Sequence, residues 1–208
     1  MAKIVIFGAG GRAGRAAVAE ARRRGHVVTA VVREPARQVI SDDAVSVVAG
    51  DVTDVDSVAR VADGNDAAIS AVYDPAARPD AFFTGAARAL LDGLHRAGVD
   101  RLLVVGLASV LADADGVPLL DTPGYPQEYR SFFLAHQAAL DIFEESRLDW
   151  VSVAPAGDFN HADPSRTGAY RIAAGDAQGL ISYADFAIAV VDEVDHPGHH
   201  RSAIGVVV

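Results

Sequence analysis

Residues 3–17 read KIVIFGAGGRAGRAA, an apolar run followed by four glycines within seven residues. The apolar run predicts a strand, and the stretch rich in alanine and arginine after the glycines predicts a helix. A glycine-rich turn between a strand and a helix lets the backbone approach a pyrophosphate, which the amide groups and the dipole of the helix then attract. The opening stretch therefore predicts a dinucleotide site, the alternative being a tight turn that binds nothing.

The glycines fit two registers that belong to different enzyme families. Gly8, Gly10 and Ala13 spell G-x-G-x-x-A, whereas Gly8, Gly11 and Gly14 spell G-x-x-G-x-x-G. Both patterns are typical of dinucleotide binding, so the choice between them depends on residues further along the chain.

Predicted strands and helices alternate along the rest of the sequence. Strands are expected at 4–7, 26–32, 45–48, 67–71, 101–105, 150–154 and 203–207, and helices at 12–24, 55–61, 82–96, 132–145 and 183–194. Strict alternation predicts parallel strands joined by right-handed crossovers. We therefore expect one α/β domain over residues 1–208, a Rossmann-type doubly wound parallel sheet with helices on both faces.

The alternation loosens at two places, about 111–131 and 157–179. Both segments follow predicted strands of the sheet. Because ligands bind at the carboxyl edge of such sheets, we expect these two segments to form the loops of a substrate pocket.

The composition narrows the range of partners. The 208 residues carry a net charge of −10, which argues against nucleic acid and anionic membranes as ligands. No cysteine is present, and the histidines at 196, 199 and 200 have no carboxylate at ligand spacing in that stretch, so no metal site is expected. No apolar run approaches the roughly 20 residues of a membrane span. We expect a cytoplasmic protein with a small-molecule substrate, and its apolar segment 186–194 could be shared in a homodimer.

The end of the second predicted strand bears on the choice of cofactor. An acidic residue there favours NAD, whereas an arginine accommodates the 2′-phosphate of NADP. Arg33 stands at this point, and Arg12 and Arg37 are further candidates for the same phosphate. Glu34 follows at once, so NADP(H) is the preferred cofactor while NAD(H) and a merely solvated Arg33 stay open.

Two later strand ends complete the expected cofactor site. Asp51 and Val52 would hold the adenine, although Asp51 or Asp54 could instead cap the next helix. Small side chains after the fourth strand would let a ribose pass close to the backbone, namely Ser70, Ala71 and Val72.

The motifs GAGGRAG, VVRE, GDVTD and AISAV together resemble the atypical short-chain dehydrogenase/reductases. Within that group the chain is similar to the NAD(P)H-binding, NmrA-like single-domain proteins, which include flavin reductases. Later segments such as RLDWVSVAPAGDF and LISYADFAIAVVDEV extend the resemblance over nearly the whole chain. The resemblance favours the G-x-x-G-x-x-G register, with which Arg33 and Asp51 agree.

The resemblance also implies an NADP-preferring Rossmann domain and a role for each matching residue. The pyrophosphate would lie on Gly8, Gly11, Arg12, Ala13 and Gly14, with Gly10 a further cofactor-binding candidate in the same loop. The adenosine phosphate would lie at Arg33, the adenine at Asp51 and Val52, the centre of the cofactor at Ser70, Ala71 and Val72, and the nicotinamide near Ser109, Pro155 and Ala156.

The sequence lacks the tyrosine–lysine pair of conventional short-chain dehydrogenases. The single lysine is Lys3, and the residue four positions after Tyr125 is Tyr129. This weighs against carbonyl reduction, dehydration and epimerisation, but a flavin already accepts electrons and needs mainly to be positioned. We expect an NAD(P)H-dependent reductase of a flavin or similar conjugated acceptor, with the flavin as substrate rather than bound group. The alternative is a non-catalytic NADP(H)-sensing regulator that resembles NmrA.

Three residues are candidates for the catalytic end of the site. Ser109 could hydrogen-bond the carboxamide or the substrate, or be a turn residue. His136 could donate a proton near pH 7, or be an exposed helical histidine. Tyr129, with Tyr125, could form an aromatic wall of the pocket, or lie in a surface loop.

Overall fold

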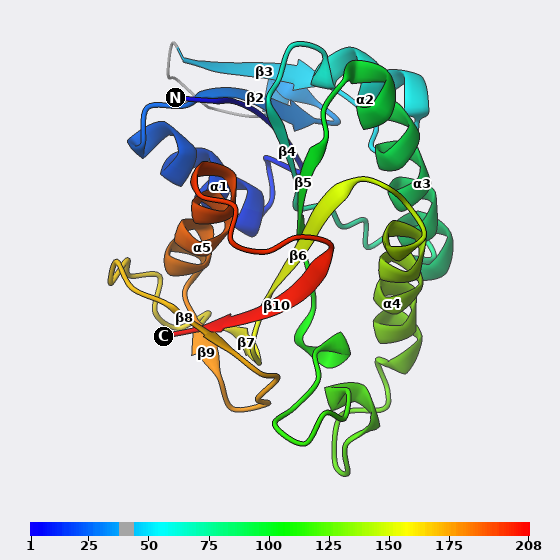
Figure 1. Cartoon of the computed structure of the whole chain (residues 1–208), viewed down its shortest axis with the longest axis vertical. Coiled ribbons are helices and arrows are strands. Elements are labelled where there is room, and N and C mark those ends of the chain that lie inside the picture. The colour runs from blue at the N-terminus through cyan, green and yellow to red at the C-terminus, as the bar shows by residue number, and fades with distance from the viewer. Residues whose placement is uncertain (38–43) are drawn as a thin grey trace.

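The computed structural model describes residues 1–37 and 44–208, and this part of the chain forms a central eight-stranded sheet (Figure 1). Its order is β3-β2-β1-β4-β5-β6-β10-β8, so the chain moves outward from β1 first to one side and then to the other. The strands are β1 (Lys3–Phe7), β2 (Val27–Val32), β3 (Val45–Ala49), β4 (Ala67–Ser70), β5 (Arg101–Val105), β6 (Asp149–Pro155), β8 (Arg171–Ala173) and β10 (Ser202–Val207). The predicted doubly wound Rossmann-type sheet is confirmed.

Helices cover both faces of the sheet (Figure 1). Two of them pack together on one face, α1 (Arg12–Arg23) and α5 (Tyr183–Asp195). Three follow one another on the other face, α2 (Val55–Ala62), α3 (Pro79–Ala97) and α4 (Arg130–Glu144). Helix α3 begins three residues before the predicted start because Pro79 occupies its first turn, where the missing N–H costs nothing.

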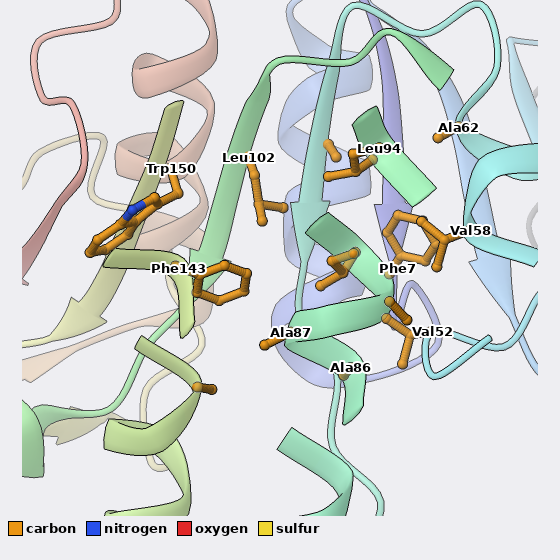
Figure 2. Packing of buried hydrophobic residues seen from close by; sticks show 14 of the residues in the cluster. Phe7, Val52, Val58, Ala62, Ala86, Ala87, Leu94, Leu102, Phe143 and Trp150 are labelled. Atoms are coloured by element: carbon orange, nitrogen blue, oxygen red, sulfur yellow. The ribbon is translucent and has the colours of Figure 1, made fainter. Parts of the chain in front are cut away.

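A hydrophobic core lies on each face of the sheet, and alternate residues of β1 point into one core or the other. Ile4 and Ile6 pack toward α1 and α5, whereas Val5 and Phe7 pack toward α2 and α3. All four are at most 1% exposed. Figure 2 shows Phe7 beside Val58 in the second of these cores. Burial on both faces explains why the four residues of β1 after Lys3 are continuously apolar rather than alternating.

The segment 157–179 was predicted to be a loop, but it contains two short strands, β7 (Asp158–Phe159) and β8. β7 pairs in parallel with β9 (Leu180–Ile181), which follows the segment, and this pair lies outside the main sheet. β8 pairs antiparallel with β10 at the sheet edge, so the expectation of a wholly parallel sheet is wrong there. Strands of two or three residues are too short to show an apolar period, which is why the sequence pattern did not indicate them.

No helix in the described ranges is long and apolar enough to cross a membrane.

The glycine loop depends on two glycines that have no room for a side chain. Gly8 has a φ of +75°, and a Cβ on it would collide with the carbonyl oxygen of Ala71. A Cβ on Gly14 would collide with the carbonyl group of Gly8 and lie 2.9 Å from the Cα of Ala9. The first and third glycines of G-x-x-G-x-x-G are therefore the ones that let β1, α1 and the end of β4 approach one another.

We predict that Gly14→Ala lowers the free energy of unfolding by about 2 kcal/mol, because the methyl group meets backbone rather than a movable side chain. Gly85→Ala is the matched control. Gly85 lies inside α3, and apart from the adjoining backbone of its own helix no atom lies within 4 Å of the position that a methyl group would take there, so alanine should add roughly 0.5–1 kcal/mol of stability. Urea denaturation measures both values. Equal changes in the two variants would show that the close approach at Gly14 is not needed.

Candidate functional site

A cleft of about 1180 Å³ runs along the carboxyl ends of the central strands. Phe7 at the end of β1, Val32 at the end of β2 and Val105 at the end of β5 line it, as do Asp51 after β3 and Ala71 after β4. Ligands of open parallel sheets bind at this edge, where the strand order reverses around β1 and β4. The cleft is therefore the candidate site, and its volume is large for a small-molecule pocket.

The glycine loop forms the middle of the cleft. Gly8, Gly10, Gly11, Arg12 and Ala13 line it, whereas Gly14 lies beneath the loop and acts through packing. Gly11 is the N-cap of α1 and provides no side-chain hydrogen bond, and the first turn holds no acidic residue.

Among the described helices, α2 and α5 have a side-chain cap at the N-terminus, whereas α3 and α4, like α1, have none. Asp54 accepts hydrogen bonds from the first turn of α2, and Ser182 does the same for α5. The N-terminal amide groups of α1 thus face the cleft without a capping side chain, which favours an anion at this point.

One end of the cleft carries the residues expected to bind adenosine. Arg33, Asp51 and Val52 all line it. The Asp51 carboxylate accepts hydrogen bonds from the backbone N–H of Thr53 at 2.8 Å and from its hydroxyl at 2.7 Å. Asp54, not Asp51, caps α2, so this alternative for Asp51 is excluded.

Two arginines here make contacts that the sequence did not indicate. Arg33 Nη1 donates to Asp74 Oδ2 at 2.6 Å. Arg12 Nη1 donates to His161 Nδ1 at 3.0 Å, and its guanidinium lies 5.8 Å from the Tyr183 ring centre. The side chain of Arg12 is thus directed toward the wall near β7 and not toward the expected 2′-phosphate position beside Arg33. The side chain of Arg37 falls outside the described part of the chain.

That wall follows β6 and lies in the segment 157–179, one of the two expected to form pocket loops, although the sequence analysis did not single out its residues; no residue of the other segment, 111–131, lines the cleft. Phe159 stacks on Tyr183 with ring centres 4.0 Å apart, and Asp158 and His161 complete the lining. The run GDFNH, directly after the sixth predicted strand, was the available signal because it stands where the helix–strand alternation stops.

The other end of the cleft is aromatic. The His136 ring packs against Phe83 at 3.9 Å and Phe132 at 4.9 Å between ring centres, and Tyr73 meets Phe132 edge-on at 5.6 Å. Burial lowers the pKa of His136 to about 4. At neutral pH the imidazole is therefore neutral, so it is a hydrogen-bonding group rather than the proton donor expected near pH 7.

A small cavity of about 30 Å³ lies behind this aromatic end and shares His136 with the cleft. Ser70 lines this cavity instead of the cleft, while Ala71 and Val72 line the cleft as predicted. Ser152 also borders the cavity, and its hydroxyl has no hydrogen-bond partner among the described residues.

Two predicted catalytic residues lie away from the cleft. Ser109 is fully buried in a turn of 3-10 helix (Ala108–Val110), because the buried neighbours Ala108 and Leu111 draw that turn into the core. Tyr129 precedes α4 with 58% of its surface exposed and its ring beside that of Phe133. Neither is among the residues that line the cleft.

Pro155 and Ala156 are likewise buried and do not line the cleft. Ala156 donates its backbone N–H to Val206 and accepts a hydrogen bond from the N–H of Asp176, both at 2.8 Å. These hydrogen bonds fix the turn at Pro155 and Ala156 below the cleft. Asp158, two residues further along the chain, is the residue of this segment that lines the cleft first.

Lys3 lies at the far end of β1 from the cleft. It begins the strand, whereas the cleft opens beside Phe7, where the strand ends. Since the sequence holds no other lysine, a tyrosine–lysine pair is excluded from this site.

Comparison with known proteins agrees with this geometry. A model of the NAD(P)H-binding family matches residues 8–197. A Burkholderia pseudomallei protein, provisionally named as exported, is 37% identical with a TM-score of 0.87, and both chains are covered in full. A Bacteroides thetaiotaomicron protein, provisionally named as an epimerase, is 34% identical with a TM-score of 0.86, over 99% of this chain and 96% of that one. A Streptococcus pneumoniae protein, provisionally named as an NADH-flavin reductase, is 32% identical with a TM-score of 0.82, over 100% and 99%.

The lowered pKa of His136 predicts a pH dependence of stability. In the unfolded chain the histidine has a pKa of about 6.5. Between about pH 6.5 and 4 the unfolded chain therefore binds a proton at this histidine that the folded chain does not. Stability should therefore fall as the pH drops through this window. His136→Asn removes this contribution, so the wild-type protein should lose roughly 2–3 kcal/mol more than the variant between pH 7 and 4. Denaturant titrations across this range measure the difference, and parallel curves for the two proteins would contradict the buried neutral ring.

Proposed function

Because the chain belongs to the NAD(P)H-binding family, we propose that it is an NADPH-preferring reductase. In this proposal it transfers a hydride to a flavin or a similar conjugated acceptor, which binds as a substrate.

The cofactor has a fitting site in the middle of the cleft. The uncapped N-terminus of α1 offers amide groups to a pyrophosphate, and Gly8, Gly10 and Gly11 present backbone without side chains to the cleft. Asp51 and Val52 suit the adenosine end. Ala71 and Val72 line the same cleft and suit the centre of the cofactor. A bound nicotinamide supplies the hydride.

The single observation that carries the choice of acceptor is the aromatic end of the cleft, which contains no lysine. Phe82, Phe83, Phe132 and Tyr73 offer flat apolar surfaces to a conjugated ring system. A carbonyl substrate needs a proton donor beside its oxygen, whereas a flavin can take the hydride and receive its proton from water. His136 is neutral at pH 7 and suits hydrogen bonding to such a ring better than proton supply.

Arg33 supports the preference for NADPH because its side chain is 67% exposed at the adenosine end of the cleft. A guanidinium matches the geometry of a phosphate and binds it through charge-assisted hydrogen bonds.

The reaction is tested by titrating the protein with NADPH and then mixing the complex with FMN under single-turnover conditions. The proposal predicts NADPH oxidation together with FMN reduction. Tight NADPH binding without oxidation by FMN or a quinone would overturn the reductase and favour the NADP(H)-sensing regulator. Reduction or rearrangement of a sugar nucleotide instead would favour an epimerase activity. The absence of a tyrosine–lysine pair argues against that activity.

Replacement of Arg33 tests the cofactor preference separately. Arg33→Ala should weaken NADPH binding about 10- to 100-fold, since a hydrogen bond to a charged group contributes roughly 1.5–3 kcal/mol, while NADH binding changes less than about twofold. Arg78→Ala is the control, because Arg78 is an exposed arginine paired with Asp80 and does not line the cleft. Cofactor fluorescence titrations give the dissociation constants. Equal losses for NADPH and NADH would refute the phosphate role of Arg33.

A further inference from the structure

The ion pair between Arg33 and Asp74 bears on how the cleft distinguishes the two nicotinamide cofactors. Arg33 Nη1 lies 2.6 Å from Asp74 Oδ2, and the side chains are 67% and 20% exposed. The second carboxylate oxygen of Asp74 accepts a hydrogen bond from the backbone N–H of Ala76 at 3.0 Å. Asp74 is thus fixed by its own turn, and the longer, more exposed Arg33 is the partner that can change its contacts.

The charges around this pair are mostly negative. Among the side chains that the structure describes at this end of the cleft, Glu34, Asp51 and Asp74 are the carboxylates that line it together with Arg33. NADPH differs from NADH by a 2′-phosphate, which carries up to two negative charges near neutral pH. A phosphate that binds Arg33 must therefore share the guanidinium with Asp74 or displace it.

We propose that Asp74 determines cofactor selectivity by competing with the 2′-phosphate for Arg33. The inference rests on the proposed function, whose site it refines. Asp74 keeps the preference for NADPH lower than Arg33 alone would make it, and it leaves NADH binding almost unaffected. The difference between the NADPH and NADH affinities is then smaller than it would be without Asp74.

A positioning role for Asp74 would have the opposite sign. If the carboxylate held Arg33 ready for the phosphate, its removal would weaken NADPH binding. The geometry favours competition, because the contact occupies a guanidinium nitrogen that would otherwise be free to meet the phosphate, and because the Arg33 side chain is 67% exposed and can exchange one partner for another.

Asp74→Asn tests the proposal with little change in shape, since the asparagine carbonyl oxygen can still accept the N–H of Ala76. Isothermal titration calorimetry with NADP⁺ and NAD⁺ should show an approximately five- to tenfold gain in NADP⁺ affinity and less than about a twofold change for NAD⁺. Asp74→Glu keeps the charge and should retain nearly the wild-type ratio of the two affinities. Weaker NADP⁺ binding by Asp74→Asn, or an equal gain for both cofactors, would overturn the competition.

Two further variants separate competition from a general effect of charge. In the Arg33→Ala background, Asp74→Asn should change NADP⁺ affinity less than about twofold, because the group that is competed for is gone. An undiminished gain in that background would also overturn the proposal. Asp80→Asn removes the same charge from an exposed pair that does not line the cleft, and it should leave the affinity ratio unchanged.

These titrations contain no hydride acceptor, so their outcome is independent of the reductase reaction. A protein that binds NADP⁺ but never reduces FMN would fail the proposed function, while Asp74→Asn could still confirm the competition. Conversely, FMN reduction with an unchanged affinity ratio in Asp74→Asn would support the reductase and overturn the role of Asp74.

Discussion

The contact on which the site depends is the close approach of backbone at Gly8, Gly14 and Ala71. No Cβ fits at either glycine, so β1 can turn sharply into α1 while the end of β4 lies against the turn. This approach brings the uncapped start of α1 to the carboxyl edge of the sheet, at the middle of the cleft. An anion bound there meets the amide groups of the helix. The strands on one side of β1, β2 and β3, lead to one end of the cleft, and the strands on the other side, β4 and β5, lead to the other end.

Different physical features mark the three parts of the cleft. The end near β2 and β3 is charged and holds the Arg33–Asp74 pair. The middle offers backbone groups, and the end near α4 is aromatic, with a histidine whose pKa is lowered by burial. A charged nucleotide, a pyrophosphate and a flat conjugated ring would match these parts in that order, which is the order of these groups in a nicotinamide dinucleotide.

The sequence predicts most of the fold because its strands and helices are long enough to show their periods, and because strand ends in a doubly wound sheet meet at one edge. It cannot indicate β7 and β8, which have two and three residues. Ser109 illustrates a second limit, because its burial depends on apolar neighbours that draw the whole turn into the core. The Arg33–Asp74 pair joins residues 41 positions apart and becomes visible only with the fold.

The central claim is that the start of α1 holds the cofactor pyrophosphate and Arg33 receives the 2′-phosphate. A crystal structure of the complex with NADP⁺ tests it most directly. The account predicts pyrophosphate oxygens within hydrogen-bonding distance of the first-turn amides of α1, the 2′-phosphate on Arg33, and the nicotinamide directed toward His136. A pyrophosphate away from that helix end, or a cofactor bound with its nicotinamide beside Arg33, would contradict it.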